Sequence, residues 1–200
     1  MNTCYIVGAS PFEETFTLDE SDLLIAADGG QIALARMGLR PHLAVGDFDS
    51  SDMPTNIPTV RHPVEKDDTD TALAVKEGMR RGYKHFILYG CTGGRLDHTL
   101  ANIQTLHRLS VEGFHGYLVS DDGTVSTVIV NKALQFSPKG TVSILSLTDE
   151  SLGVTVEGLK YPLNGVRLTN DYPLGVSNEG TGAPAKISVK QGALYVSWMR

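Results

Sequence analysis

The sequence predicts an α/β protein in which a mainly parallel sheet is followed by a smaller all-β region. In roughly the first 120 residues, short apolar runs alternate with segments whose apolar residues have helical spacing. From about Ser120 onward, apolar and polar residues mostly alternate, and no helical pattern of comparable quality appears. Alternating strands and helices are typical of a parallel sheet covered on both faces, whereas a period of two indicates strands with one buried face. We therefore expect two domains that meet near Asp121-Asp122-Gly123.

Five apolar runs in the N-terminal region are short enough to be buried strands. They lie at residues 5–7, 23–27, 43–45, 86–89 and 117–119. A weaker candidate at 59–61 is followed by Pro63, which cannot donate to a sheet ladder and so places this strand at an edge.

Three helices are predicted between these strands. Residues 31–37 and 71–81 are each followed by a glycine, Gly38 and Gly82, that can end a helix in a left-handed conformation. The third helix has apolar residues at spacings of three and four, which give it one apolar face. These residues are Leu96, Leu100, Ile103, Leu106 and Leu109.

The C-terminal region repeats short alternating segments that are separated by turn-forming residues. Four segments containing glycine together with Pro, Asn, Lys or Gln predict turns, at 138–140, 163–165, 173–175 and 190–192. We expect a small all-β domain of about 75 residues, which alone would form a marginal core. Its edge strands and apolar faces make dimerisation plausible.

Composition excludes several classes of protein. The chain has 200 residues, of which 41% are hydrophobic, so it can bury a substantial core. A net charge of −6 argues against a nucleic-acid partner, because a phosphate backbone requires a dense Lys and Arg surface. Neither a signal peptide nor a membrane span is recognisable, so we expect a cytoplasmic protein without a membrane partner. Cys4 and Cys91 are expected to be reduced thiols in the core.

Acidic residues gather in two places that point to phosphate chemistry. Asp47 and Asp49 follow the third predicted strand, and a second group at Asp67, Asp68 and Asp70 comes about twenty residues later. Carboxylates that converge in a cleft repel one another and need a compensating cation. Mg²⁺ suits such oxygen ligands and is usually shared with the phosphates of a substrate.

Simpler explanations exist for parts of this pattern. An EF-hand that began at Asp47 would need Gly and Glu where the chain has Asp52 and Pro58, so that interpretation fails. Either Thr69 or Asp70 is expected to cap the following helix.

Two glycine pairs also follow predicted strands, where ligands of a parallel sheet bind. Gly93-Gly94-Arg95 lies between a strand and a helix, so backbone N–H groups and a bidentate guanidinium are available to an anion. The spacing matches neither a Walker loop nor the dinucleotide fingerprint. Taken alone, Asp28-Gly29-Gly30 is more often a tight turn or a helix entry than a ligand site, and a first-turn position explains Asp97. For His98, a surface or packing role is at least as plausible as catalysis.

Taken together, the motifs resemble the thiamine pyrophosphokinase family. The N-terminal motifs are Asp28-Gly29-Gly30, Gly46-Asp47-Phe48-Asp49-Ser50, Lys66-Asp67-Asp68-Thr69-Asp70 and Gly93-Gly94-Arg95-Leu96-Asp97-His98. The resemblance spans the chain, because residues 158–163 and Ser177-Asn178-Glu179 match the family's second domain. It implies a Rossmann-like α/β ATP-binding catalytic domain over 1–122 and a β-sandwich thiamine-binding and dimerisation domain over 123–200. The implied reaction is Mg²⁺-dependent transfer of pyrophosphate from ATP to thiamine by a homodimer, leaving AMP.

The resemblance also implies roles for individual residues. Asp47, Asp49 and Asp70 would hold Mg²⁺ and the ATP phosphates. The nucleotide site would include Asp28, Gly29, Gly30, Lys66, Asp67, Gly93, Gly94, Arg95 and His98. Asp97 would contact thiamine, and Ser177 and Asn178 would bind its aminopyrimidine ring. Catalysis would rest on Asp49, Asp70 and Asp97, with Asp70 or Asp97 accepting the proton of the thiamine alcohol.

Two other functions remain open from the sequence. Asp47-Phe48-Asp49-Ser50-Ser51 is similar to the nucleophile motif of haloacid-dehalogenase-like phosphatases, in which an aspartate is phosphorylated. Against a phosphatase, the motif follows the third predicted strand instead of the first. The second alternative is a non-enzymatic protein that binds a nucleotide or thiamine.

Overall fold

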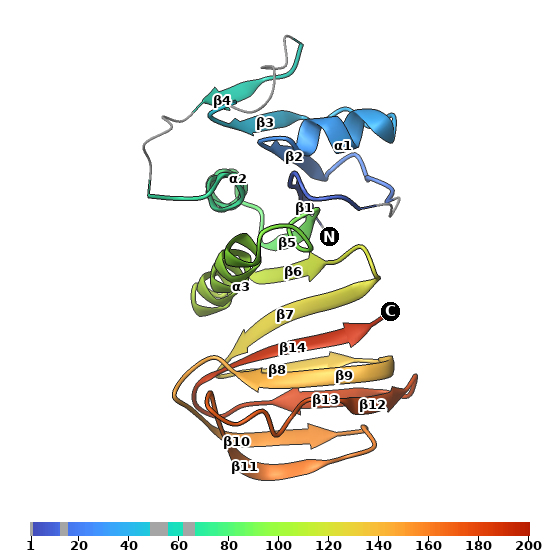
Figure 1. The fold of residues 1–200 in the computed structure, drawn as a ribbon, viewed down its shortest axis with the longest axis vertical. Helices are drawn as coiled ribbons and strands as arrows, with labels where there is room; N and C mark the ends of the chain where they lie inside the picture. The colour runs from blue at the N-terminus through green and yellow to red at the C-terminus, as the bar shows by residue number, and fades with distance from the viewer. Residues whose placement is uncertain (1, 13–15, 49–55, 62–66) are drawn as a thin grey trace. The chain divides into compact units, whose positions relative to one another are not determined.

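The computed structural model of the chain describes residues 2–12, 16–48, 56–61 and 67–200 (Figure 1). The chain divides into two compact units. The first contains Met1–Thr105 and Phe114–Asp122, and the second contains Leu106–Gly113 and Gly123–Arg200. Each unit is described separately below.

Unit 1 is built on a parallel sheet of six strands. The strands are β1 (Thr3–Val7), β2 (Leu23–Ala27), β3 (Leu43–Gly46), β4 (Thr59–Arg61), β5 (His85–Tyr89) and β6 (His115–Val119). Their spatial order is β6-β5-β1-β2-β3-β4, and every neighbouring pair is parallel. The five predicted buried strands and the predicted edge strand are therefore confirmed.

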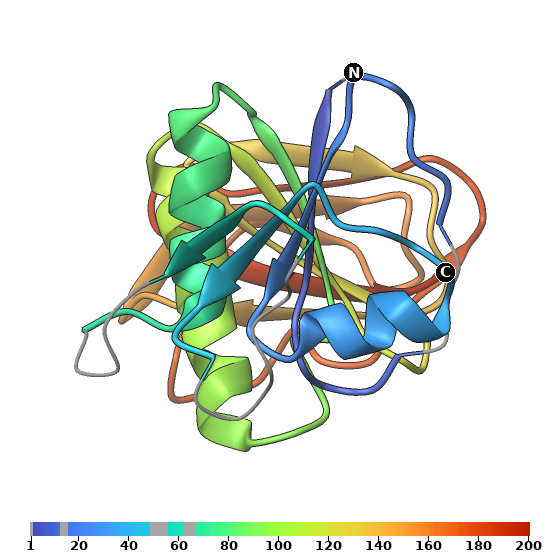
Figure 2. The same cartoon turned by 90° about the horizontal axis from the view of Figure 1, so that it is seen from above.

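Three helices connect these strands: α1 (Gly30–Arg36), α2 (Asp70–Arg80) and α3 (Leu96–Val111). Figure 2 shows α1 on one face of the unit 1 sheet and α2 on the other. This is the arrangement that right-handed crossovers require, because the β2–α1–β3 and β4–α2–β5 connections run in opposite directions along the sheet. All five residues of β2 are buried, as expected for a strand covered on both faces.

The connectivity of unit 1 reverses beside β1. From β1 the chain moves outward through β2, β3 and β4, and then crosses back to β5 on the opposite side of β1. The loops that follow β1 and β5 therefore leave the sheet in opposite directions. In open α/β sheets such a switch point leaves a crevice beyond the carboxyl ends of the strands.

Unit 2 contains two four-stranded antiparallel arrangements. Its strands are β7 (Thr124–Val130), β8 (Ala133–Phe136), β9 (Lys139–Ser146), β10 (Glu150–Glu157), β11 (Leu163–Thr169), β12 (Asn178–Thr181), β13 (Ala185–Ser188) and β14 (Ala193–Met199). One arrangement has the order β12-β9-β14-β7 and the other β11-β10-β13-β8.

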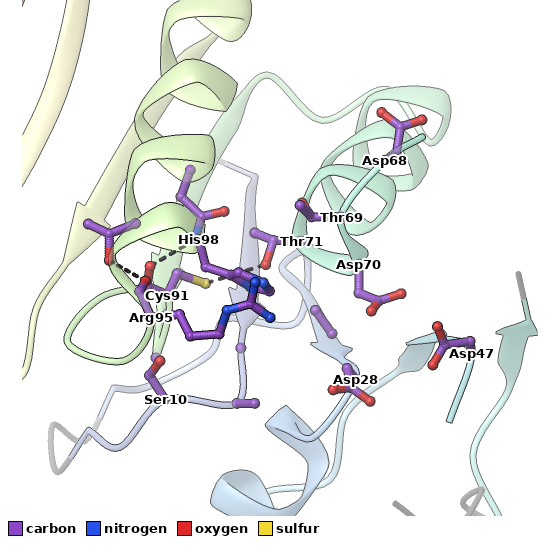
Figure 3. Close-up of a pocket in the computed structure, with 16 residues that line it drawn as sticks. Ser10, Asp28, Asp47, Asp68, Thr69, Asp70, Thr71, Cys91, Arg95 and His98 are labelled. Carbon is purple, nitrogen blue, oxygen red and sulfur yellow. Dashed lines mark hydrogen bonds between the residues drawn. The ribbon is translucent and has the colours of Figure 1, made fainter. Parts of the chain in front are cut away.

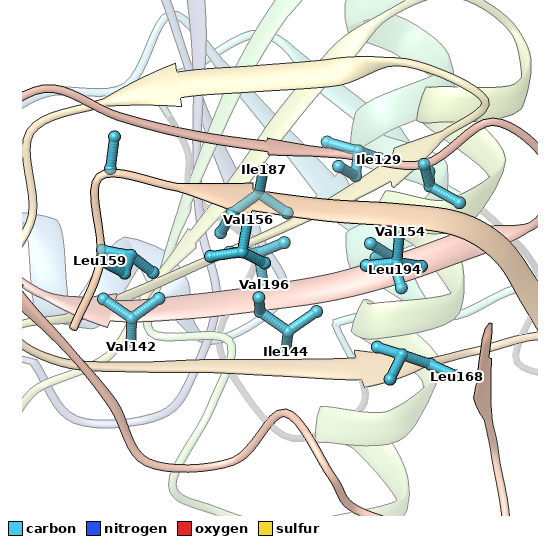
Figure 4. Packing of buried hydrophobic residues seen from close by; sticks show 12 residues of the cluster. Ile129, Val142, Ile144, Val154, Val156, Leu159, Leu168, Ile187, Leu194 and Val196 are labelled. Carbon is cyan, nitrogen blue, oxygen red and sulfur yellow. The ribbon is translucent and has the colours of Figure 1, made fainter. Parts of the chain in front are cut away.

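The core of unit 2 lies between these two layers (Figure 4). Val142 and Ile144 of β9 and Val196 of β14 belong to the same buried cluster as Val156 of β10 and Ile187 of β13. Interdigitation of the inner faces of two antiparallel layers is the packing of a β-sandwich. The predicted fold class, a mainly parallel α/β region followed by an antiparallel β region, is thus confirmed.

Three local predictions were wrong in part. Residues 163–165 begin β11, and Lys139 and Gly140 belong to β9, so neither segment is a simple turn. Gly140 and Gly165 have positive φ angles inside these strands, and glycine there marks an irregular strand as readily as a turn. The expected apolar face of α3 is buried only in its second half: Leu96 and Leu100 are 73% and 53% exposed.

Two other expectations concern the cysteines and membrane-spanning segments. Cys4 and Cys91 are both free and buried, as predicted. Burial raises the pKa of Cys91 to about 12, so its thiol stays protonated at neutral pH. No helix in the described part of the chain is long and apolar enough to cross a membrane.

The C-terminal end of α2 predicts a pH-dependent contribution to stability. Hydrogen bonds from Arg80, and then from Arg81, lower the pKa of Glu77 from 4.5 to about 2. The two arginines are 70% and 38% exposed, so solvent screening limits the contribution to about 1 kcal/mol. Because the folded pKa is the lower one, this contribution is complete above about pH 4.5 and is lost as the pH falls toward 2.

Thermal unfolding of wild type and Glu77→Gln as a function of pH measures this contribution. The variant should be less stable than wild type near pH 6, and the difference should shrink steadily below pH 4.5. A difference that is the same at both ends of this range would contradict the assignment.

Candidate active site

A cavity of about 530 Å³ lies at the switch point of the unit 1 sheet. Its walls come from the loops after β1, β2, β3 and β5 and from the first turns of α2 and α3. The lining residues are Gly8, Ala9, Ser10, Ala27, Asp28, Asp47, Asp68, Thr69, Asp70, Thr71, Gly90, Cys91, Arg95, His98, Thr99 and Asn102. Parallel strands bring these distant segments together because all their carboxyl ends meet at one edge of the sheet.

Gly8 and Gly90 line this cavity, and their backbones lie so close together that neither position has room for a side chain. We call these two residues the floor of the cavity. A Cβ on Gly8 would lie 2.5 Å from the carbonyl oxygen of Gly90, and a Cβ on Gly90 would lie 2.8 Å from the carbonyl oxygen of Gly8. The N–H of Ser10 donates to the Gly90 carbonyl at 2.9 Å. Side chains are therefore excluded at both positions, and the two loops offer backbone to a ligand.

Three carboxylates face one region of the cavity (Figure 3). Asp28 follows β2 in a left-handed conformation with φ 47°, and its N–H donates to the Val45 carbonyl at 2.8 Å. Asp47 directly follows β3, and Asp70 is the first residue of α2. Thr69 caps that helix by accepting a hydrogen bond from the Ala72 N–H at 3.2 Å, so one of the two expected capping residues does cap it.

A fourth carboxylate, that of Asp68, also lines the cavity. Its Oδ2 atom forms an ion pair with Nζ of Lys76 at 2.6 Å. Figure 3 shows its carboxylate apart from those of Asp47 and Asp70. The charge of Asp68 is therefore balanced within the chain.

Arg95 and His98 supply the opposite wall (Figure 3). Arg95 makes a two-point ion pair with Asp97, in which Nε donates to Oδ1 at 3.1 Å and Nη2 donates to Oδ2. The hydrogen bonds from Arg95 lower the pKa of Asp97, with a further contribution from the His98 N–H. Asp97 is ionised at neutral pH, and the lowered pKa means that a lower pH is needed to protonate it while the pair is formed.

The structure brings together some of the predicted site residues. Asp28, Asp47, Asp70, Arg95 and His98 line the cavity. Eight predicted residues among the described ones do not line it. Gly29, Asp67, Gly94 and Asp97 are each next in sequence to a lining residue, Gly30 and Gly93 are each two residues from one, and Ser177 and Asn178 belong to unit 2. Asp49 and Lys66 lie outside the described residues.

Three of the predicted glycines have specific conformational or packing roles. A Cβ on Gly30 would lie 1.9 Å from the Val7 carbonyl oxygen, so α1 can begin against β1 only with glycine at this position. Gly94 approaches Ser10, whose Oγ would be 2.9 Å from an added Cβ. Gly93 has open space around it but a φ of 81°, which favours glycine.

Among the lining residues that sequence reasoning missed are Thr71, Thr99 and Asn102. Thr71 follows Asp70 in the first turn of α2, and Asn102 comes four residues after His98 in α3. Residues four apart share one helix face, so the helical period itself was a signal for Asn102.

Ser177 and Asn178 lie beside one another at the start of β12 in unit 2. Ser177 is exposed and has a φ of 62°. The Asn178 amide is buried and holds the backbone of Tyr161: Oδ1 accepts from its N–H at 3.0 Å, and Nδ2 donates to its carbonyl at 2.7 Å. In this structure the Asn178 side chain thus fixes the segment around Tyr161.

The donor set of the cavity fits a magnesium ion that is shared with a substrate. Among the described residues, no group of three or more His, Cys, Asp or Glu side chains is arranged to hold a metal ion by itself. Mg²⁺ requires less than this, since one or two carboxylates together with substrate phosphates and waters usually complete its shell. Asp47 and Asp70, both with oxygen donors and both facing the cavity, meet that requirement.

Comparison with known proteins identifies the family. Residues 16–118 match the model of the thiamin pyrophosphokinase catalytic domain, and residues 126–194 match that of the thiamin pyrophosphokinase vitamin B1 binding domain. The thiamine pyrophosphokinase of Bacillus subtilis is 28% identical over 218 aligned positions, with 98% of each chain covered.

Solved structures agree with this assignment. The crystal structure of the Bacillus subtilis enzyme matches with a TM-score of 0.89 at 27% identity, covering 98% of each chain. A thiamin pyrophosphokinase family protein from Enterococcus faecalis matches with a TM-score of 0.83 at 26% identity, covering 100% of this chain and 99% of the other. The chain therefore belongs to the thiamin pyrophosphokinase family.

Proposed function

We propose that this chain, an enzyme of the thiamine pyrophosphokinase class, uses the unit 1 cavity to transfer pyrophosphate from Mg·ATP to thiamine. The observation that carries the proposal is the cavity itself, in which Asp28, Asp47 and Asp70 face Arg95 and His98. One wall suits a divalent cation and the other suits phosphate oxygens. We assign residues 1–122 to ATP binding and catalysis and residues 123–200 to thiamine binding and dimerisation.

The triphosphate of ATP would lie over the glycine floor, with its charge distributed between the two walls. Asp47 and Asp70, together with Asp49, would hold Mg²⁺, and Arg95 would donate to the phosphate oxygens. Mg²⁺ would neutralise the charge that builds on the phosphate oxygens and would help align the reacting groups. On the resemblance to the family, the residues around the nucleotide would also include Asp28, Gly29, Gly30, Lys66, Asp67, Gly93, Gly94 and His98.

In the proposed reaction, the hydroxyl oxygen of thiamine attacks the β-phosphorus of ATP. The bond between this phosphorus and the bridging oxygen to the α-phosphate breaks, and AMP leaves with that oxygen. The hydroxyl proton passes to a carboxylate, for which Asp70 and Asp97 are the candidates. The pair with Arg95 lowers the pKa of Asp97, so Asp97 accepts a proton less readily while this pair is formed.

Thiamine would be bound by Asp97 and by Ser177 and Asn178. Its fixed positive charge suits a protein with a net charge of −6 and an acidic cavity. We propose that the active form is a homodimer in the cytoplasm, where a partner supplies part of the thiamine site. The exposed Leu96 and Leu100 at the start of α3 support an additional covering surface.

A product assay tests the proposal. Incubation with ATP, Mg²⁺ and thiamine should yield AMP and thiamine diphosphate, and omission of thiamine should abolish AMP formation. Asp49→Asn should lower turnover by orders of magnitude while the fold stays intact. Inorganic phosphate released without thiamine would indicate a phosphatase, and binding without turnover would indicate a sensor.

Chelation provides a separate prediction about the metal. Treatment with excess EDTA should abolish AMP formation, because the facing carboxylates would repel an uncompensated triphosphate. Added Mg²⁺ should restore the activity, and the circular dichroism spectrum should stay the same throughout. Full turnover in the chelated sample would refute the assignment of Asp47 and Asp70 as metal ligands.

A further inference from the structure

A buried polar contact in the cavity wall has no part in the proposed chemistry. Asn102 of α3 is 4% exposed, and its Nδ2 donates to the carbonyl oxygen of Cys91 at 2.8 Å. Cys91 is itself buried, two residues beyond the end of β5. A buried carbonyl without a donor is unfavourable, so this contact fixes the start of the loop to the second turn of α3.

The loop that this contact helps to fix contains two glycines with positive φ angles. Gly90 and Gly93 adopt φ angles of 60° and 81°, and glycine permits many alternative conformations at such positions. The loop ends at Arg95, about two helical turns before Asn102. The hydrogen bond between Asn102 and Cys91 therefore joins the two ends of a short segment, residues 91–102, that contains Gly94 and Arg95.

Cys91 also contacts the other helix that borders the cavity. Its Sγ lies 3.9 Å from Oγ1 of Thr71, which follows Asp70 in the first turn of α2. The same Sγ donates to the Tyr89 carbonyl at 3.2 Å. One residue thus touches the helix that carries Asp70 and the helix that carries His98, and Asn102 holds that residue in place.

We propose that Asn102 is a positioning residue for the nucleotide. Through the Cys91 carbonyl it sets the separation between the carboxylate wall and the wall formed by Arg95 and His98. This inference rests on the proposed function, in which one triphosphate and its cation must touch both walls at once. Small errors in such spacing are costly because every contact across the cavity weakens together.

Direct binding of a non-hydrolysable Mg·ATP analogue, measured by calorimetry, tests this role. Asn102→Ala should weaken binding about 10- to 100-fold, as removal of a supporting hydrogen bond does at other charged sites. Thr105→Ala is the matched control, since the Thr105 hydroxyl donates to the Ala101 carbonyl of the same helix and not to the loop. It should bind within about twofold of wild type. Thermal unfolding of both variants separates affinity from stability.

A second variant, Asn102→Ser, keeps the test decisive if Asn102→Ala does not fold. Asn102→Ser keeps a polar group in the helix but is too short to reach the Cys91 carbonyl, so it should also bind more weakly than Thr105→Ala. In steady state, both Asn102 variants should raise KM for Mg·ATP more than they lower kcat.

The outcomes distinguish this inference from the proposed function. If wild type fails to bind the Mg·ATP analogue, the proposed function itself fails. If wild type binds and the folded Asn102 variants bind equally well, only the positioning role is overturned. Loss of folding in both variants would assign Asn102 to stability alone and would likewise overturn it.

Discussion

Asp70→Asn should lower kcat on the order of 10³-fold while leaving the fold intact. Asp70 faces the cavity at the first residue of α2, and the amide would remove one of the charges proposed to hold Mg²⁺. Stability should fall only by about 0.3–1 kcal/mol, because a first-turn carboxylate interacts favourably with the helix dipole. Steady-state formation of AMP and thermal unfolding measure the two effects.

Asp68→Asn is the matched control for this experiment. Asp68 is two residues away and also lines the cavity, but Lys76 balances its charge at 2.6 Å. Losing a partly exposed ion pair costs about 0.2–1 kcal/mol, and turnover should stay within a few-fold of wild type. Equal losses of activity in the two variants would mean that total negative charge matters, and not the position of Asp70.

Gly30→Ala should destabilise unit 1 by about 3 kcal/mol. The added Cβ would lie 1.9 Å from the Val7 carbonyl oxygen and 2.7 Å from its carbon, so the start of α1 must move away from β1. Both of these groups are backbone, which cannot rotate aside as a flexible side chain can. Urea unfolding followed by circular dichroism should show the loss as a lower midpoint with a similar slope.

Gly29→Ala separates packing from ligand binding in the same motif. Gly29 has an ordinary φ of −65°, and its added Cβ would meet the Cβ of Ala9 at 3.1 Å and the Cα of Ala9 at 3.8 Å. The free energy of unfolding of the Gly29→Ala variant should differ from that of wild type by less than about 1 kcal/mol. If Gly29 also borders the nucleotide, Gly29→Ala should weaken Mg·ATP binding without lowering the unfolding midpoint. Equal destabilisation by the two alanine substitutions would contradict the packing role of Gly30.

The sequence was sufficient to predict the regular parts of unit 1. Continuous apolar runs such as 23–27 correspond to strands that are buried on both faces, and these are the strands that periodicity identifies most clearly. Unit 2 was predicted in outline but not strand by strand. β8 and β12 contain four residues each, which is too short for an alternating pattern to stand out, and their positions follow from pairing with distant strands.

The candidate site was predictable where chemistry coincides with a strand end. Asp28 and Asp47 were identified in this way, and both face the cavity. The contribution of Asn102 could not be identified in this way, because it depends on a single hydrogen bond to a loop residue eleven positions earlier in the chain. The hydrogen bonds between the Asn178 side chain and the Tyr161 backbone could not be predicted for the same reason. The sequence does not tell which backbone group a buried amide will contact.

The pairing of β1 with β5 has a consequence for how the protein is made. Thr3 lies beside His85, so roughly eighty residues must be synthesised before the first strand meets this neighbour. Closing so long a stretch of chain is slow compared with the formation of a helix. On the ribosome, the floor made by Gly8 and Gly90 cannot form until Gly90 has left the exit tunnel, so we expect the proposed nucleotide site to form only after nearly half of the chain has emerged.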